Sequence, residues 1–260
     1  MKCEHKVILI TGASSGIGAA TALQLAKSDN ILIITARREE KLMALADQIR
    51  TLGSTCDYYV GDATNPEHGP KVVAEIVKKH GRIDLALLNV GIGPPSNCLT
   101  ASSDTITYCM RANFDSFIHF YVPLMAQMKS QTTSCMIAHM NSQATWFGIP
   151  MQGDYTAAKA AVRIFMETAR MELKHFGIRH IKLQTIHPGF VDTEAVRNDG
   201  IPAPNEISEE KAADYVLRGF EKEMKTNVFP PSTALLSRLG RIMPDWVRER
   251  VLLAETPKSY

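Results

Sequence analysis

The stretch Thr11 to Gly18, T-G-A-S-S-G-I-G, constrains the fold more than any other part of this chain. It follows an apolar, β-branched run that begins at Lys6, and it opens the helical pattern A-A-T-A-L-Q-L-A-K. A strand, a glycine turn and a helix in this order are typical of a dinucleotide-binding unit, because glycines let the backbone approach a pyrophosphate held at the helix N-terminus. The alternative is a turn that only joins strand to helix. The candidate nucleotide contacts here are Gly12, Ser14, Ser15, Gly16, Ile17 and Gly18.

Strand-like and helix-like patterns then alternate along the chain. Apolar runs at 30–35, 56–63, 83–88, 134–141 and 181–186 are separated by segments with helical periodicity. This alternation predicts an α/β fold, a Rossmann-type doubly wound parallel sheet of about seven strands with helices on both faces in three layers. Because 260 residues with 45% apolar side chains suffice for a sizeable core, we expect one domain over 1–260. Ligands bind beyond the carboxyl ends of such strands.

Charge and cysteine content exclude several classes of function. The net charge of +2 comes from mixed acidic and basic residues without a basic tail, so no nucleic-acid partner is predicted. The five cysteines lack C-x-x-C spacing and the eight histidines lack an H-E-x-x-H pattern, which favours reduced thiols and no metal site. No apolar run has transmembrane length and the N-terminal one is too short for a signal peptide, so we expect a cytoplasmic protein.

The residues after the second predicted strand bear on the choice of cofactor. A carboxylate about twenty residues beyond the glycine turn would hold the ribose of NAD, whereas an arginine there accommodates the 2′-phosphate of NADP. The chain has Ala36, Arg37 and Arg38 at this point. Because arginine binds phosphate bidentately, NADP(H) is favoured over NAD(H). The alternative is a solvated helix start in which one arginine pairs with Glu39 or Glu40.

Three further segments are expected at the same edge of the sheet. The third strand ends at Asp62 and Ala63, where the carboxylate could accept a hydrogen bond from adenine or cap a helix that begins near Pro66. The fourth strand leads to Asn89 and Gly91. A loop from His187 after the sixth strand would close on a bound cofactor, and its candidate contacts are Pro188, Gly189, Val191 and Thr193.

A hydroxyl, a phenol and an amine come together in the stretch 140–159. Tyr155 and Lys159 are four apart in an Ala-rich helical pattern, so both leave one face, and Ser142 ends a buried strand. A nearby ammonium favours the phenolate and lowers a tyrosine pKa from about 10, which suits proton transfer. Alone, Y-x-x-x-K is weak, because a half-buried ring and a solvated amine are common on helices. Asn113, in an apolar helical segment at 103–128, is either a satisfied structural amide or a residue that bends the helix or holds a water.

Two later segments could shape a substrate site. The polar, proline-containing stretch 194–207 is predicted to form a mobile lid. The amphipathic stretch 229–253 alternates apolar residues with arginines, which could suit a membrane surface or an acyl substrate; packing against the domain is the favoured interpretation. Four apolar side chains, Trp146, Phe147, Met151 and Phe190, indicate an apolar pocket.

With these residues assembled, the chain resembles the short-chain dehydrogenase/reductase family from the T-G-x-x-x-G-x-G turn to the P-G-x-x-x-T loop. The resemblance implies a catalytic tetrad of Asn113, Ser142, Tyr155 and Lys159, in which Asn113 positions a water that relays protons to the lysine. Tyr155 and Lys159 are also implied to contact the cofactor, with Lys159 holding its ribose. It also assigns Asp62 to adenine, Asn89 and Gly91 to the cofactor edge, and Pro188, Val191 and Thr193 to the nicotinamide carboxamide. The chain departs from the family where N-N-A-G reads Leu88-Asn89-Val90-Gly91 and S-S reads Asn141-Ser142.

The activity implied is NADP(H)-dependent hydride transfer to or from a ketone or secondary alcohol. The apolar side chains named above and the C-terminal segment favour a hydrophobic substrate of acyl or steroid type. The resemblance also implies a homodimer or homotetramer through helices at 103–128 and 154–176. One alternative is a catalytically silent NADP(H)-binding regulator or scaffold, which the complete tetrad disfavours. Another is an epimerase or dehydratase on the same scaffold.

Overall fold

The computed structural model of the chain describes residues 1–194, 196–197, 205–254 and 256. A parallel sheet of seven strands runs through it in the order β3-β2-β1-β4-β5-β6-β7. The strands are β1 (Val7–Thr11), β2 (Ile31–Ala36), β3 (Thr55–Val60), β4 (Leu85–Leu88), β5 (Cys135–Met140), β6 (Ile181–Pro188) and β7 (Thr226–Phe229). The predicted Rossmann-type doubly wound sheet is therefore confirmed.

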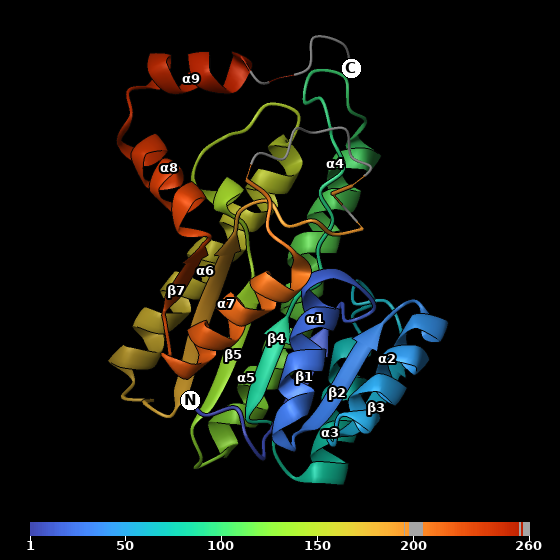
Figure 1. Cartoon of the computed structure of the whole chain (residues 1–260). Helices are drawn as coiled ribbons and strands as arrows, with labels where there is room; N and C mark the ends of the chain where they lie inside the picture. The colour runs from blue at the N-terminus through green and yellow to red at the C-terminus, as the bar shows by residue number, and fades with distance from the viewer. Residues whose placement is uncertain (195, 198–204, 255, 257–260) are drawn as a thin grey trace.

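Helices cover both faces of this sheet (Figure 1). One face packs against α1 (Gly16–Leu25), α2 (Glu39–Thr51) and α7 (Glu209–Glu221), and the other packs against α3 (His68–His80), α5 (Ser116–Ser130) and α6 (Gly153–His175). The remaining helices are α4 (Ser103–Met110), α8 (Pro231–Ile242) and α9 (Asp245–Ala254), with short turns η1 (Ala26–Ser28), η2 (Arg111–Asp115) and η3 (Gln143–Trp146). This arrangement gives the three expected layers.

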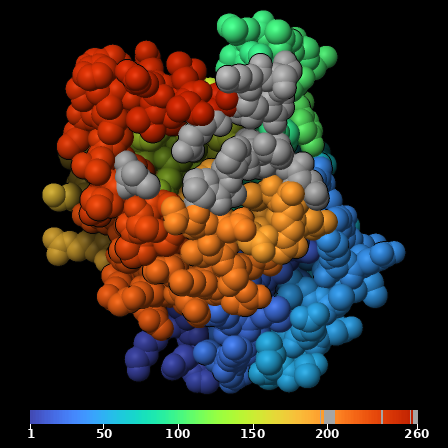
Figure 2. Space-filling view, turned by 45° about the horizontal axis from the view of Figure 1, so that its top comes forward, coloured from blue at the N-terminus to red at the C-terminus, as the bar shows by residue number. Residues whose placement is uncertain are grey.

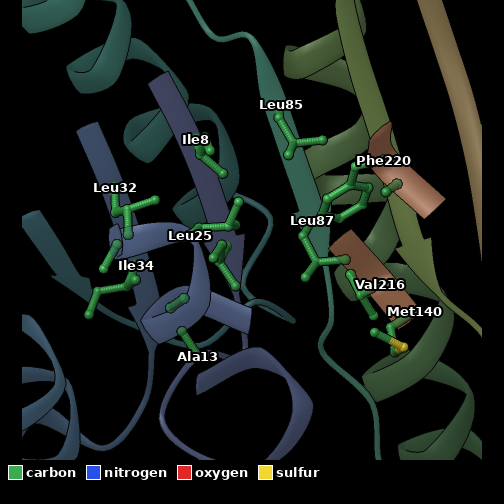
Figure 3. Packing of buried hydrophobic residues seen from close by; sticks show 14 of the residues in the cluster. Ile8, Ala13, Leu25, Leu32, Ile34, Leu85, Leu87, Met140, Val216 and Phe220 are labelled. Carbon is green, nitrogen blue, oxygen red and sulfur yellow. The ribbon is translucent and has the colours of Figure 1, made fainter. Parts of the chain in front are cut away.

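The central strands are apolar on both sides because each face of the sheet is buried. In β1, Ile8 belongs to the core under α1 and α7, whereas its neighbour Leu9 belongs to the core on the opposite face. Figure 3 shows the first of these cores, with Leu25 of α1 against the strands and Phe220 of α7 beside Leu87. Continuous apolar runs in the sequence therefore correspond to strands between two helix layers.

The strand order places the sequence motifs next to one another. From β1 the chain winds outward through β2 and β3, and then returns to β4 on the other side of β1. Thr11 of β1 pairs with Leu88 of β4 at the carboxyl ends of these two strands. The glycine turn and Asn89 therefore both emerge where the order of the strands reverses. In doubly wound sheets this switch point is where ligands bind.

The long helix expected at 103–128 is interrupted. It forms α4 and α5 with a π-helical turn, η2, between them, and Asn113 lies in this turn. The Asn113 Nδ2 donates to the Cys109 carbonyl over 2.9 Å, so a side-chain amide enters the backbone hydrogen-bond ladder. The expectation that this asparagine bends the helix is consistent with the widened turn.

Two other predicted segments differ in how far the structure describes them. Of the predicted lid at 194–207, residues 195 and 198–204 lie outside the described residues. The C-terminal stretch forms the end of β7 followed by α8 and α9, which stand beyond the carboxyl ends of the strands (Figure 1). Viewed toward that end, α8 and α9 lie across from the green segment that leads into α4 (Figure 2).

Candidate active site

A cavity of about 860 Å³ opens at the carboxyl ends of the strands. It extends from the glycine turn to α8 and α9, and most of the predicted site residues line it. These lining residues are Gly12, Ser14, Ser15, Gly16, Ile17, Arg37, Arg38, Asp62, Ala63, Asn89, Gly91, Ser142, Tyr155, Lys159, Pro188, Gly189, Val191 and Thr193. Two predicted site residues, Gly18 and Asn113, are buried and are not among the described residues that line the cavity.

The glycine turn has the geometry that a pyrophosphate site requires. Gly12 and Gly16 have φ angles of +63° and +64°, a region that side chains disfavour. A Cβ on Gly18 would lie 2.6 Å from Asn89 Nδ2 and 2.8 Å from the Gly12 carbonyl, so the third glycine permits close packing. The first turn of α1 contains no acidic residue, and its amide groups give a helix N-terminus suited to an anion. The turn therefore fits a dinucleotide phosphate.

Asn89 connects the glycine turn to the end of β4. Its side-chain Nδ2 donates to the Gly12 carbonyl over 3.0 Å, and its backbone N–H donates to the Thr11 Oγ1 over 3.0 Å. Both bonds fix the backbone of the turn. Asn89 thus supports the nucleotide site while it also lines it.

The two arginines after β2 point in different directions. Arg38 Nε and Nη2 donate to the Ser14 hydroxyl over 3.1 and 2.9 Å, so this guanidinium lies over the glycine turn. Arg37 faces Asp62 instead, with 3.9 Å between Nη1 and Oδ2. Among the described residues neither arginine pairs with Glu39 or Glu40, and both arginines line the cavity.

Asp62 forms a turn and does not cap α3. Its Oδ1 accepts hydrogen bonds from the Thr64 N–H and hydroxyl, each over 2.8 Å, whereas α3 begins only at His68. Burial raises the pKa of Asp62, but the two Thr64 hydrogen bonds and the Arg37 charge outweigh burial and lower it. The carboxylate therefore stays ionised beside Arg37 at the cavity edge.

Ser142, Tyr155 and Lys159 meet on one wall of the cavity. Ser142 follows β5, and its Oγ accepts the Ala144 N–H over 3.1 Å, which fixes the side chain at the start of η3. Tyr155 and Lys159 project from α6, with the Lys159 Nζ 5.8 Å from the centre of the Tyr155 ring. The predicted juxtaposition of hydroxyl, phenol and amine is present in the structure.

The protonation of this group is controlled mainly by burial. Burial raises the pKa of Tyr155, and a hydrogen bond with Ser142 only partly offsets that rise. The lowered tyrosine pKa that the nearby lysine predicted is not found, because desolvation of the phenolate dominates. Burial also lowers the pKa of Lys159 to about 8, and its Nζ donates to the Met140 carbonyl over 2.9 Å.

Two glycines make room for this wall: Gly91, which was predicted as a cofactor contact, and Gly93, which the sequence did not single out. A Cβ on Gly91 would lie 2.7 Å from the Lys159 Nζ and 2.8 Å from the Asn113 Oδ1. A Cβ on Gly93 would lie 3.1 Å from the Tyr155 ring. A glycine at the end of β4 was visible in the sequence, but the side chains that it faces depend on the tertiary fold.

Asn113 is completely buried and its amide is satisfied by backbone groups. Its Nδ2 donates to the carbonyls of Ile92 and Cys109 over 2.7 and 2.9 Å, and its Oδ1 accepts the Ile92 N–H over 3.3 Å. These bonds hold the loop after β4 against η2. Asn113 therefore acts on the site through the backbone near Gly91, consistent with the structural alternative.

Asn141, which departs from the family pattern, is also part of the support. Its Nδ2 donates to the Lys159 carbonyl over 2.9 Å, and its Oδ1 accepts the Ser142 N–H over 2.9 Å. One buried amide thus connects the end of β5 to α6. It fixes Ser142 and Lys159 relative to each other.

The far end of the cavity is apolar, with one correction to the predicted set. Phe147, Met151 and Phe190 line it as expected, and Val251 of α9 adds to them. Trp146 is not among the described lining residues; its ring stacks on His187 with 4.8 Å between centroids. Trp146 therefore lies outside the described cavity wall, although its sequence neighbour Phe147 lines it.

The C-terminal helices form the outer wall of this apolar end. Gly240 of α8 packs against Phe147, since a Cβ there would lie 2.7 Å from the ring. The opposite surface of the two helices exposes apolar side chains, including Ile242 and Trp246. The α8 part of the stretch therefore packs against the domain, as favoured, whereas α9, all of which is described, has no buried residue, and both helices expose apolar side chains.

Metal binding and membrane spanning have no support in the described residues. No group of three or more His, Cys, Asp or Glu side chains there could hold a metal ion. Within the same residues, no helix has both the length and the apolar character needed to cross a membrane.

Comparison with known proteins gives a consistent result. Residues 6–202 match the family model of short chain dehydrogenases. The chain is 34% identical over 194 residues to an uncharacterized oxidoreductase of Listeria monocytogenes, an alignment that covers 75% of this chain and 77% of the relative. It is 31% identical over 210 residues to 11-beta-hydroxysteroid dehydrogenase A of Sesamum indicum, which covers 80% of this chain and 59% of that protein.

A solved structure also resembles the whole chain. It is a short chain dehydrogenase/reductase from Burkholderia phymatum in complex with NAD, with a TM-score of 0.84. The sequences are 21% identical, and the alignment covers 100% of this chain and 99% of the other. This likeness supports the fold described above.

Proposed function

The chain belongs to the short-chain dehydrogenase/reductase family, and from this premise we propose that it is an NADP(H)-dependent oxidoreductase acting on a hydrophobic ketone or secondary alcohol. One observation carries the proposal. Ser142, Tyr155 and Lys159 lie on one wall of a cavity whose other end is a glycine turn fitted to a dinucleotide. The nicotinamide cofactor, when bound, supplies or accepts the hydride.

The residues near the glycine turn support NADP(H) as the cofactor. β2 ends at Ala36, so no carboxylate at that point would repel a 2′-phosphate. Arg37 and Arg38 both line the cavity, and the Arg38 guanidinium already contacts the Ser14 hydroxyl. Guanidinium groups bind phosphate bidentately, which favours the phosphorylated cofactor. Pro188, Val191 and Thr193 line the same cavity and are proposed to hold the carboxamide end.

The proton chemistry is assigned to Tyr155. Its raised pKa keeps the phenol protonated at neutral pH, so in the reductive direction it can donate a proton to the oxygen that develops negative charge. Ser142 is placed to donate a hydrogen bond to the same oxygen. Lys159, when protonated, stabilises the tyrosinate left behind, and its pKa near 8 leaves it mostly cationic at neutral pH.

Asn113 and Asn141 are assigned positioning roles. Asn113 holds the backbone around Ile92, and Asn141 joins Ser142 to the Lys159 backbone. Both amides make these hydrogen bonds to backbone groups. We therefore assign to both the support of geometry, with no part in proton donation.

The substrate class follows from the apolar end of the cavity. Phe147, Met151 and Val251 offer contact to a hydrophobic body, whereas the polar groups gather around Tyr155. Binding there buries apolar surface and leaves a single oxygen at the catalytic wall. A relative named for a hydroxysteroid activity supports the choice of a steroid-like or acyl substrate.

Assembly and location are proposed on separate observations. α5 exposes Val122, and α6 exposes Ile164 and Met171, which would suit pairing of these helices in a homodimer or homotetramer. All five cysteines are free thiols, which fits the reducing cytoplasm. We also propose that residues 1–260 fold as one domain.

The direct test combines nucleotide binding with turnover. Purified protein is titrated with NADPH and with NADH by nucleotide fluorescence, and is then supplied with NADPH and a panel of steroidal and long-chain ketones. We expect tighter binding of NADPH and reduction of at least one ketone with equal consumption of NADPH. If neither nucleotide binds, the proposal is wrong. Product formed without net consumption of NADPH would indicate an epimerase or dehydratase, and tight binding without turnover would favour the regulator.

A further inference from the structure

Glu194 lies where the loop after β6 crosses the glycine turn. The preceding residue, Thr193, approaches Gly16, since a Cβ on that glycine would lie 3.4 Å from the Thr193 Cγ2. The Glu194 carboxylate reaches across the cavity edge, and it lines the cavity together with Ser14 and Arg38. A carboxylate is thus present next to the proposed phosphate site.

This carboxylate is held by two cations from the β2–α2 junction. Arg38 Nη1 donates to Glu194 Oε2 over 2.8 Å, and Lys41 Nζ donates to the two carboxylate oxygens over 3.1 and 2.9 Å. These contacts join distant parts of the sequence, because Arg38 and Glu194 are 156 residues apart. Hydrogen bonds from Lys41 and then Arg38 lower the pKa of Glu194 to about 2, so the group is an anion at any working pH.

The same cations are those that a 2′-phosphate would need. The remaining nitrogens of Arg38 donate to the hydroxyls of Ser14 and Ser15 in the glycine turn. One guanidinium therefore contacts both the turn and Glu194, and Lys41, the third residue of α2, pairs with the same carboxylate. Two cations and two hydroxyls around one anion form a site for a phosphomonoester.

We propose that Glu194 is a specificity-determining residue that competes intramolecularly with the 2′-phosphate of NADP(H) for Arg38 and Lys41. The inference rests on the proposed function, because it takes the 2′-phosphate as the ligand. NADP(H) must displace the carboxylate from the two cations before its phosphate can bind them. NADH carries no such phosphate and leaves the ion pairs in place. Glu194 therefore lowers the preference of the protein for NADPH over NADH.

The expected size of this effect is moderate. A phosphate carries more charge than a carboxylate and presents three oxygens, so it can win the competition. The apparent affinity for NADPH is the intrinsic affinity multiplied by the fraction of molecules in which Arg38 and Lys41 are not paired with Glu194. Because the side chains of all three residues are about half exposed, solvent weakens the pairs, and we expect a penalty of about fivefold.

The experiment measures binding, so it is independent of turnover. Dissociation constants for NADPH, NADH and 2′,5′-ADP are measured by calorimetry for the wild type, Glu194→Gln and Glu40→Gln. Glu40 is a matched control, because it is an exposed carboxylate beside Lys41 that forms no ion pair within the described part of the chain. In Glu194→Gln we expect about fivefold tighter binding of NADPH and of 2′,5′-ADP, with NADH unchanged. Glu40→Gln is expected to leave all three within twofold.

Several outcomes would overturn the proposal. Unchanged or weaker NADPH binding in Glu194→Gln would do so, as would equal tightening of NADPH and NADH, which would indicate a general charge effect. A further check removes one cation. In a Lys41→Met background the gain from Glu194→Gln is expected to shrink, and an undiminished gain would contradict the role of Lys41. If the wild type binds neither nucleotide, the proposed function fails; if it binds NADPH and only the Glu194 effect is missing, the competition alone fails.

Discussion

At the nucleotide end of the cavity, the ion pairs of Arg38, Lys41 and Glu194 have side chains that are 43%, 46% and 51% exposed. At the catalytic end, Lys159 is 3% exposed and its amine donates to a backbone carbonyl. Water and salt screen the first group, so each pair contributes little. The second group is desolvated, and its pKa shifts strongly. Changes at the two ends should therefore differ in size and in kind.

Among substitutions that replace no residue of the tetrad, Gly91→Ala should have the largest effect. The new Cβ would collide with the Lys159 Nζ and the Asn113 Oδ1, so the amine must move. A displacement of about 1 Å at a catalytic group can cost about a hundredfold in rate. We expect kcat to fall by about that factor while NADPH binding changes much less.

The matched control is Gly148→Ala, whose Cβ would meet no atom within 4 Å. It should keep wild-type kinetics. Wild-type kcat in Gly91→Ala would show that the catalytic end is as tolerant as the nucleotide end, and the contrast between the ends would break down.

Lys159→Met should change how stability depends on pH. The pKa of Lys159 is about 8 in the folded protein against a usual value of 10.5, so the unfolded chain binds this proton more tightly. The unfavourable contribution of the amine is complete below pH 8 and is lost as the pH rises to 10.5. Relative to Lys159→Met, the wild type should therefore gain up to about 3 kcal/mol of unfolding free energy across this window.

Urea unfolding of both proteins at a series of pH values measures this difference, because the titration of all other groups cancels. A difference that stays constant from pH 8 to 10.5 would mean that the buried amine is not desolvated. The distinction between the two ends would then rest on geometry alone.

Arg37→Ala should have the smallest effect, in keeping with the exposed end. Arg37 is 63% exposed on its side chain and lies 3.9 Å from Asp62, so it is not tightly paired. We expect the dissociation constant of NADPH to rise about tenfold, as for the loss of one charge-assisted contact, with kcat and NADH binding unchanged. Arg179→Ala, an exposed arginine at the amino end of β6, is the control. A fall in kcat for Arg37→Ala would show coupling between the ends.

The sheet and the glycine turn were predictable from the sequence because they depend on local patterns. Apolar runs between helical segments fix the strands, and T-G-A-S-S-G-I-G must follow a strand to function as a phosphate turn. The spacing of Tyr155 and Lys159 likewise follows from the helix period. Such features need no knowledge of the tertiary fold.

Other features depend on contacts between distant segments. The direction of the Arg38 side chain is set by Ser14 and by Glu194, which lies 156 residues away. The raised pKa of Tyr155 and the stacking of Trp146 on His187 both depend on burial in the folded chain. Local sequence patterns do not reveal this burial. These contacts, and the fit of Gly91 against Lys159, became clear only from the folded structure.

The most direct test of hydride transfer with Tyr155 as the proton donor is the turnover of Tyr155→Phe alongside its binding of NADPH. Once a ketone substrate has been identified, kcat should fall by about a hundredfold to ten-thousandfold, because a positioned general acid contributes about 10² to 10⁴ in rate. The dissociation constant of NADPH should stay within about threefold of the wild type. Tyr121→Phe, a buried tyrosine packed against Phe117 and Phe165, is the control and should keep full activity. Full turnover in Tyr155→Phe would contradict the assignment of the catalytic wall.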